Sequence, residues 1–177
     1  MTYLGSASPK MTGGFNLNMS YKGFDMVLFL TGSYGNEIVN SMYQNLYNSK
    51  MFETNISQDM ALNHWSATNT SSDIPRLDAA DLNKNVENFS DRYVEDGSYL
   101  RVKNFQLGYT IPSSVASKVH VKNLRIYASF DNLLTFTKYT GLDPEIFGLY
   151  GDRFYYGVDM VNYPQPRTYS VGLNLTL

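Results

Sequence analysis

The stretch QPRTYSVGLNLTL (165–177) decides the fold, because from Thr168 onward apolar and polar side chains alternate strictly. The apolar set consists of Tyr169, Val171, Leu173, Leu175 and Leu177. The other set is small and polar and consists of Thr168, Ser170, Gly172, Asn174 and Thr176. Successive side chains of a strand face opposite sides of its sheet, so the pattern predicts a strand with one apolar and one polar face. Such a polar face, without Lys or Glu, is typical of a barrel wall between lipid and a polar lumen. The pattern alone also allows a soluble β-sheet.

The composition narrows the class of protein. The 177 residues fit one domain, and only 17% of them are charged, so no basic patch favours nucleic acid as a partner. Cysteine is absent, which excludes a disulfide framework and a thiolate metal site. No run of eighteen apolar residues is present, which excludes a membrane-spanning helix, whereas a barrel strand needs only about 9–11 alternating residues. The first nine residues lack the basic start and apolar run of a secretory signal. We therefore expect either a cytoplasmic protein or a fragment whose natural N-terminus lies elsewhere.

The same alternation recurs along the chain and predicts five strands, at about 12–21, 24–34, 98–111, 123–137 and 166–177. Lys22-Gly23 predicts a two-residue hairpin turn, and Pro112 predicts the start of a short turn with one helical turn. Within 98–111 the apolar phase changes between Val102 and Phe105. One extra residue near Lys103 and Asn104 reconciles the two phases, which predicts a β-bulge there.

The connections between these strands alternate between short and long. The long ones span 35–97 and 138–164; the first predicts a short helix from Asn36-Glu37 and otherwise shows almost no periodicity. Long loops lie outside and short turns inside in outer-membrane barrels. Five strands are too few to close, and the first and last would be bare edges. The expected fold is therefore all-β, an antiparallel meander of about five strands that belongs to a larger transmembrane β-barrel with two long extracellular loops.

Several stretches resemble the C-terminal end of the SusC/RagA family, the TonB-linked outer-membrane transporters of Bacteroidetes. They are SYLRVKNFQLGYTIP (98–112), LRIYASFDNLLTFTKYTGLDPE (124–145) and YPQPRTYSVGLNLTL (163–177). GGFNLNMSYKGFD (13–25) and SDRYVEDGSYLR (90–101) fit the same family in the same order. The resemblance covers nearly the whole chain, and the fixed order of the motifs makes it specific.

The resemblance implies a 22-stranded barrel with an N-terminal plug, of which residues 1–177 would be the C-terminal segment. The plug and the remaining barrel would then lie outside this chain. It further implies import of oligosaccharides or peptides across the outer membrane, powered by TonB through the plug. A SusD-like surface lipoprotein would close over the barrel, and outer-membrane lipid would surround it. The residues by themselves leave an alternative, a small soluble β-sheet module that binds carbohydrate.

Five aromatic residues in the long loops are candidates for contact with the lid lipoprotein or the cargo: Trp65, Tyr150, Phe154, Tyr155 and Tyr156. Aromatic faces suit the apolar faces of sugar rings. The same residues would equally pack the loops or form an aromatic girdle at the membrane interface.

No catalytic, metal or cofactor site is expected. The second long loop contains four carboxylates, those of Asp143, Glu145, Asp152 and Asp159, but they lack the D-x-D-x-D-G spacing of a calcium loop. His64 and His120 are the only histidines, and no serine or carboxylate stands in a triad frame with them. We therefore do not expect an enzyme.

The alternation assigns side chains to two faces of the barrel wall. The predicted lipid-facing set is Phe15, Leu17, Met19, Leu124, Ile126, Ala128, Tyr169, Val171, Leu173 and Leu175. The predicted lumen-facing set is Asn16, Asn18, Ser20, Arg125, Tyr127, Ser129, Thr168, Ser170, Gly172 and Asn174.

Overall fold

The computed structural model describes residues 3–50, 55–86, 88–146 and 155–176, and the chain forms two compact units. The sheet unit contains Pro9–Asn36, Gly97–Lys138 and Pro164–Leu177. The loop unit contains Met1–Ser8, Glu37–Asp96 and Tyr139–Tyr163, so the two long connections fold together. Within the described residues, no helix has the length and apolar character needed to cross a membrane.

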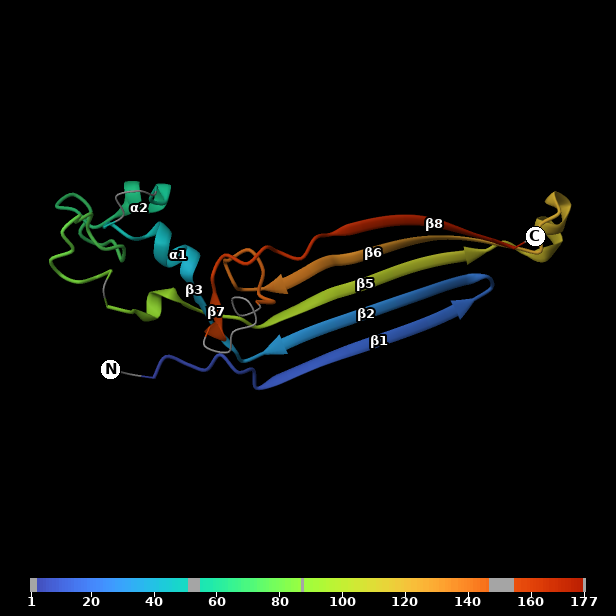
Figure 1. Ribbon diagram of the computed structural model, residues 1–177, viewed down its shortest axis with the longest axis horizontal. Coiled ribbons are helices and arrows are strands. Elements are labelled where there is room, and N and C mark those ends of the chain that lie inside the picture. Colours follow the sequence, from blue (N-terminus) through green and yellow to red (C-terminus); the bar gives the residue numbers. More distant parts are fainter. Residues whose placement is uncertain (1–2, 51–54, 87, 147–154, 177) are drawn as a thin grey trace. The chain divides into compact units, whose positions relative to one another are not determined.

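The sheet unit is a five-stranded antiparallel sheet with the strand order β1-β2-β5-β6-β8 (Figure 1). Its strands are β1 (Met11–Tyr21), β2 (Phe24–Tyr34), β5 (Tyr99–Thr110), β6 (Asn123–Thr137) and β8 (Thr168–Thr176). The expected antiparallel meander is therefore confirmed. The largest difference is at β8, which begins at Thr168 rather than at 166.

The two short connections form as the sequence predicts. Lys22 and Gly23 both have positive φ, 47° and 88°, as a type I′ hairpin turn requires, and Tyr21 pairs with Phe24 across them. Between β5 and β6 lie α3 (Ser113–Ala116) and the 3₁₀ turn η2 (Ser117–Val119), with Pro112 at the N-cap.

The predicted bulge in β5 is confirmed at Lys103. On one side Phe29 pairs with Asn104 and Leu30 with Val102, so Lys103 has no opposite residue on β2. The register with β6 also shifts between Val102 and Asn104. The extra residue restores the alternation, so the side chains of Val102 and Phe105 share one face.

The register brings the alternating side chains of all five strands into common rows. One row contains Leu17, Leu28, Phe105, Phe130 and Tyr169. The neighbouring row contains Asn18, Val27, Gln106, Ser129 and Ser170. The first row belongs to an apolar face and the second to a polar face. The two sets predicted from the alternation therefore group on opposite faces of one sheet.

The loop unit has a sheet of its own, with the strand order β4-β3-β7. Its strands are β3 (Glu37–Asn40), β4 (Val94–Asp96) and β7 (Val158–Asp159). Its helices are α1 (Ser41–Leu46), α2 (Gln58–Asn63) and the 3₁₀ turn η1 (Asp91–Tyr93). This sheet was not predicted, because strands of two to four residues are too short to show periodicity.

The predicted helix of the loop unit begins later than expected. Glu37–Asn40 pairs as β3, and Ile38 of this strand is fully buried. The side chain of Asn40 accepts a hydrogen bond from the backbone N–H of Tyr43 (2.9 Å), which caps α1 at its first turn. The helix predicted from the spacing of Ile38, Met42 and Leu46 therefore begins only at Ser41.

Candidate functional site

An ion pair spans the polar face of the sheet near its short-turn end. Arg125 on β6 donates from Nε to Oδ1 of Asp25 on β2 (2.9 Å) and from Nη2 to Oδ2 of the same carboxylate. The strand between them is β5, and its Gly108 pairs with both Asp25 and Tyr127. A Cβ at position 108 would lie 2.5 Å from Nη2 of Arg125 and 2.6 Å from the Asp25 oxygens. The ion pair can therefore form only because residue 108 is a glycine and has no side chain.

Tyr127 extends this arrangement toward β8. The Cζ atom of Arg125 lies 4.9 Å from the centre of the Tyr127 ring, a cation–π contact. A Cβ at Gly172, the β8 residue opposite Tyr127, would lie 2.3 Å from that ring. Gly108 and Gly172 therefore leave the space that these three side chains fill. The Asp25 carboxylate, the Arg125 guanidinium and the Tyr127 ring form a row that crosses β2, β5, β6 and β8.

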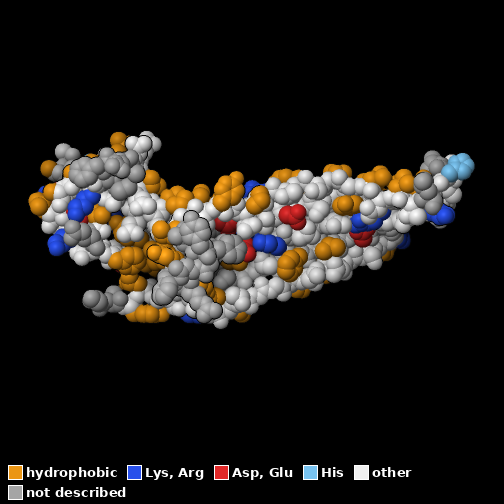
Figure 2. All heavy atoms as spheres, in the orientation of Figure 1, with side chains coloured by type: hydrophobic (Ala, Val, Ile, Leu, Met, Phe, Trp, Pro, Cys, Tyr) orange, Lys and Arg blue, Asp and Glu red, His pale blue; other side chains and the backbone are white. Residues whose placement is uncertain are grey.

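A second polar contact lies farther along the same face. Asn104 on β5 donates from Nδ2 to Oδ1 of Asp131 on β6 (2.7 Å), and the same atom lies 3.3 Å from Oγ of Ser129. Uncharged polar atoms and backbone also dominate the sheet surface that Figure 2 shows, with few charged side chains among them. The polar face therefore carries few charged side chains, as the lumen wall of a barrel does.

The apolar face of the sheet is open. Val171 on β8 is 83% exposed, and other large apolar side chains of this face are also exposed: Phe15, Met19, Ile126, Tyr169, Leu173 and Leu175. A contiguous apolar surface of this extent marks contact with a membrane or with another protein.

The loop unit is held together by buried polar contacts. The O–H group of Tyr139 donates to Oδ2 of Asp159 (2.6 Å), and both residues are buried. Burial, and then the bond to Asp159, raises the pKa of Tyr139 well above its ordinary value, so its phenol stays protonated. Asn40 donates to Glu95 (2.8 Å), which ties β3 to β4. These bonds join segments that are distant in the sequence.

The structure places the predicted contact residues in the loop unit as far as it describes them. Trp65, Tyr155 and Tyr156 are exposed. Trp65 follows α2, and its backbone N–H donates to the carbonyl of Ile74 (2.8 Å), whereas the two tyrosines directly precede β7. Tyr150 and Phe154 lie outside the described residues. The described candidates therefore come from two separate segments.

The sequence analysis did not predict the polar side-chain contacts within the two units, such as the Asp25–Arg125 ion pair and the Tyr139–Asp159 hydrogen bond. Arg125 had been assigned to the polar side, but its pairing with Asp25 depends on the register of three strands. The alternation within each strand was the available signal, but only the register puts Asp25 and Arg125 on the same face. Within the described residues, no group of three or more His, Asp or Glu side chains is arranged to hold a metal ion.

Comparison with known proteins gives close relatives over nearly the whole chain, although no family model matches. TonB-dependent receptor P3 of Formosa agariphila is 40% identical, over 97% of this chain and 17% of the receptor. TonB-dependent receptor SusC of Bacteroides thetaiotaomicron is 28% identical, over 92% of this chain and 14% of SusC. The chain thus spans less than a fifth of the length of these relatives, which are named as receptors rather than enzymes.

Comparison with solved structures gives the same group of proteins. The RagAB peptide importer in its closed-closed state matches with a TM-score of 0.78 and 30% identity, over 97% of this chain and 18% of that one. The open-open state of the same importer matches with a TM-score of 0.70 and 29% identity, over 96% and 17%. Both the sequence and the fold of the five-stranded sheet are therefore shared with one group of proteins. The chain belongs to the SusC/RagA family of TonB-dependent receptors.

Proposed function

We propose that this chain is the C-terminal part of the wall of an outer-membrane importer. The observation that carries the proposal is the continuous apolar face of the sheet, exposed on all five strands and opposite a polar face. In a barrel, lipid covers such an apolar face and the polar face lines the lumen. Family membership supports the same arrangement.

A soluble carbohydrate-binding module is a poorer explanation of the same surface. A soluble sheet buries one face against a second layer, whereas this apolar face is exposed. The outer edges of β1 and β8 also have no partner strand among the described residues, and bare edges favour aggregation. In a larger barrel, lipid would cover the exposed apolar face, and further strands would pair with the free edges of β1 and β8.

Membership of the family also supports a proposal for the activity and the partners of the whole protein. RagAB is described as a peptide importer, and SusC is a TonB-dependent receptor. The whole protein imports oligosaccharides or peptides, with energy from TonB delivered through a plug and with a SusD-like lipoprotein as its lid. In this arrangement the loop unit lies outside the cell, because it contains both long connections and outer-membrane barrels place long loops outside. Its exposed Trp65, Tyr155 and Tyr156 are then available to the lid or the cargo.

The wall orientation is tested by placing Lys on each face of β8 in the complete receptor. Val171→Lys puts a charge on the apolar face and should cost about 2–4 kcal/mol near mid-membrane. Ser170→Lys is the matched control, because Ser170 is the preceding residue, lies on the polar face and is exposed. Gly172 is unsuitable as a control, because the Tyr127 ring occupies the space of its side chain.

The measurement is the unfolding free energy of the receptor refolded into lipid vesicles, together with the amount inserted in cells. We expect Val171→Lys to lose stability and Ser170→Lys to resemble the unmodified receptor. Equal losses at the two positions would contradict the orientation of the wall.

A further inference from the structure

The hairpin turn between β1 and β2 is fixed against the end of β5. The backbone N–H of Thr110 donates to the carbonyl of Gly23 in the turn (2.7 Å). The approach is close, because a Cβ at Gly23 would lie 2.8 Å from the carbonyl oxygen of Thr110 and 3.2 Å from the ring of Tyr109. The turn and the end of β5 therefore hold each other, and Lys22 projects from a defined backbone position.

Aromatic side chains end the apolar face at this turn. Tyr21, Phe24 and Tyr109 are opposite one another on β1, β2 and β5. Tyr21 alternates in step with Leu17, so this row belongs to the apolar face. Tyr21 is 70% exposed and Phe24 is 54% exposed, and the ring centres of Phe24 and Tyr109 lie 4.5 Å apart. Aromatic residues at the end of the apolar band of a barrel lie at the level of the lipid headgroups.

The ammonium group of Lys22 lies beside this aromatic row. Its Nζ atom is 5.2 Å from the centre of the Tyr21 ring, a cation–π contact. Among the described residues, no carboxylate forms an ion pair with Lys22. Asp25, the acidic residue nearest in the sequence, is on the polar face and pairs with Arg125. Lys22 therefore places a positive charge at the margin of an apolar surface, as lysines do at membrane interfaces.

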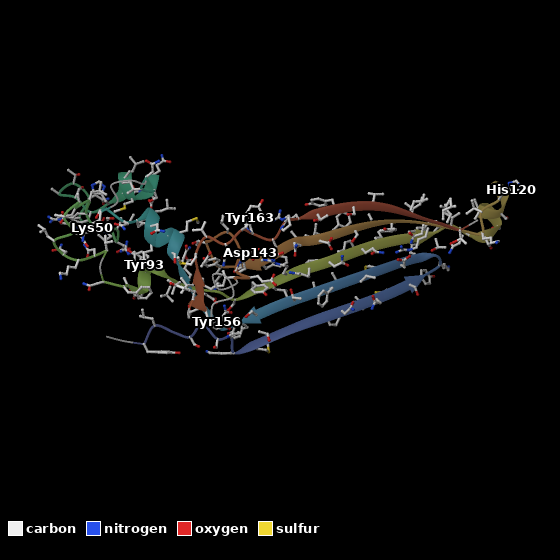
Figure 3. The ribbon with its side chains drawn as sticks, in the orientation of Figure 1. Lys50, Tyr93, His120, Asp143, Tyr156 and Tyr163 are labelled. Carbon is white, nitrogen blue, oxygen red and sulfur yellow. The ribbon has the colours of Figure 1, made fainter. Side chains whose placement is uncertain are left out.

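The charge of the short connections sets the kind of partner. Residues 21–24 and 111–122 contain no Asp or Glu. Their charged residues are three exposed lysines: Lys22, Lys118 and Lys122. His120, labelled in Figure 3, lies in the second of these connections, beyond the ends of β5 and β6. Because the basic charge is not balanced by acidic residues of these connections, this end of the sheet unit attracts anionic groups.

We propose that the end of the apolar face at the β1–β2 turn binds the anionic headgroup of a phospholipid. The residues of this headgroup site are Tyr21, Lys22, Phe24 and Tyr109. The inference rests on the proposed function, which assigns the apolar face to lipid. Further strands of a barrel extend the sheet at its edges, and the contents of the lumen meet the polar face, so neither covers this row.

Each part of the headgroup site has its own role. The ammonium of Lys22 pairs with the negative charge of the lipid headgroup. The exposed rings of Tyr21 and Phe24 contact the glycerol region and the upper part of the acyl chains, since each ring has a large apolar surface. Short turns of outer-membrane barrels face the periplasm, so the lipid belongs to the periplasmic leaflet.

The test measures lipid binding to the complete receptor in a neutral detergent by native mass spectrometry. Phosphatidylglycerol, phosphatidylcholine and inorganic phosphate are titrated separately, because only the first combines a net negative headgroup with acyl chains. Lys22→Gln removes the charge of the headgroup site. Lys118→Gln is the matched control in the other short connection, and Lys138→Gln removes an exposed lysine just after the other end of β6.

We expect the unmodified receptor to bind phosphatidylglycerol more tightly than phosphatidylcholine. Lys22→Gln should weaken this binding about fivefold, the effect of one basic residue at an anionic membrane surface. Lys118→Gln and Lys138→Gln should bind phosphatidylglycerol as the unmodified receptor does.

Three results would overturn the headgroup site. Unchanged binding in Lys22→Gln, or no preference for phosphatidylglycerol, would remove it directly. Equal losses in Lys22→Gln and Lys118→Gln would replace it by a diffuse attraction of the whole basic end. Inorganic phosphate that binds as tightly as phosphatidylglycerol would show that the ligand is a free anion rather than a lipid. None of these results affects the orientation of the wall, which the comparison of Val171→Lys with Ser170→Lys decides separately.

Discussion

Arg125 on β6 reaches over Gly108 of β5 to hold the carboxylate of Asp25 on β2, a strand with which β6 shares no ladder. The pair therefore links strands that backbone hydrogen bonds do not join. Because the side chains are partly exposed, 20% for Arg125 and 31% for Asp25, we expect a modest contribution of about 1 kcal/mol. Its main effect is to fix the positions of three polar-face strands relative to one another.

Gly108→Ala should separate this pair. The added Cβ would lie against both Arg125 and Asp25, whereas a Cβ at Gly13, on the edge strand β1, would meet nothing within 4 Å. We expect Gly108→Ala to lower the unfolding midpoint of the complete receptor and Gly13→Ala to change it little. In a receptor that already carries Asp25→Asn and Arg125→Met, Gly108→Ala should cost distinctly less. Equal losses in both backgrounds would mean that the glycine serves a different purpose.

The large sheet was predictable from the sequence because its information is local. Alternation fixes which residues share a face, and the phase change between Val102 and Phe105 locates the bulge at Lys103. The small sheet was not predictable, because β3 and β7 are short and pair across more than a hundred residues. The positive φ of Val161, 63°, leaves no sequence signal either, since valine is an ordinary residue in a loop. For the candidate contact residues, the sequence could show only that they are aromatic and that they lie in the long loops.

Tyr139→Phe should loosen the loop unit without affecting the sheet. The substitution keeps the ring but leaves Oδ2 of the buried Asp159 carboxylate without the hydroxyl that donates to it. An unsatisfied buried acceptor costs about 1–3 kcal/mol, and more for a charged group. We expect faster amide exchange in β3 and β7 and unchanged exchange in β5 and β6, measured on the complete receptor by mass spectrometry. Tyr3→Phe is the control, because Tyr3 is an exposed tyrosine of the same unit. Faster exchange throughout the sheet would contradict a local effect.

Tyr47 should ionise at unusually high pH. Burial, and then its hydrogen bond to Oδ2 of Asp59 (2.6 Å), raises the pKa of Tyr47 from 10.0 to about 12. Because the folded pKa is the higher one, the contribution of this group to stability is complete below pH 10. It decreases as the pH rises from about 10 to about 12. The difference in ultraviolet absorbance between the unmodified receptor and Tyr47→Phe isolates this one phenol. Asp59→Asn removes the carboxylate charge and should move the transition to lower pH; a midpoint near 10 in the unmodified receptor would refute the assignment.

Whole-cell labelling should distinguish the side of the membrane on which the loop unit lies from that of the short connection between β5 and β6. The chain contains no cysteine, so single cysteines can be introduced in a receptor freed of any others. Ser71 lies in the loop unit, Ser114 lies in α3 between β5 and β6, and both are exposed. If long loops lie outside and short turns inside, Ser71→Cys reacts with an impermeant thiol reagent on intact cells. Ser114→Cys should react only after the outer membrane is opened, because it lies in a short connection on the periplasmic side.

The two positions are matched in residue type and exposure, so a difference in labelling reports location rather than reactivity. Labelling of Ser114→Cys but not Ser71→Cys on intact cells would invert the proposed orientation. Labelling of both would mean that the short connection is not enclosed by the membrane.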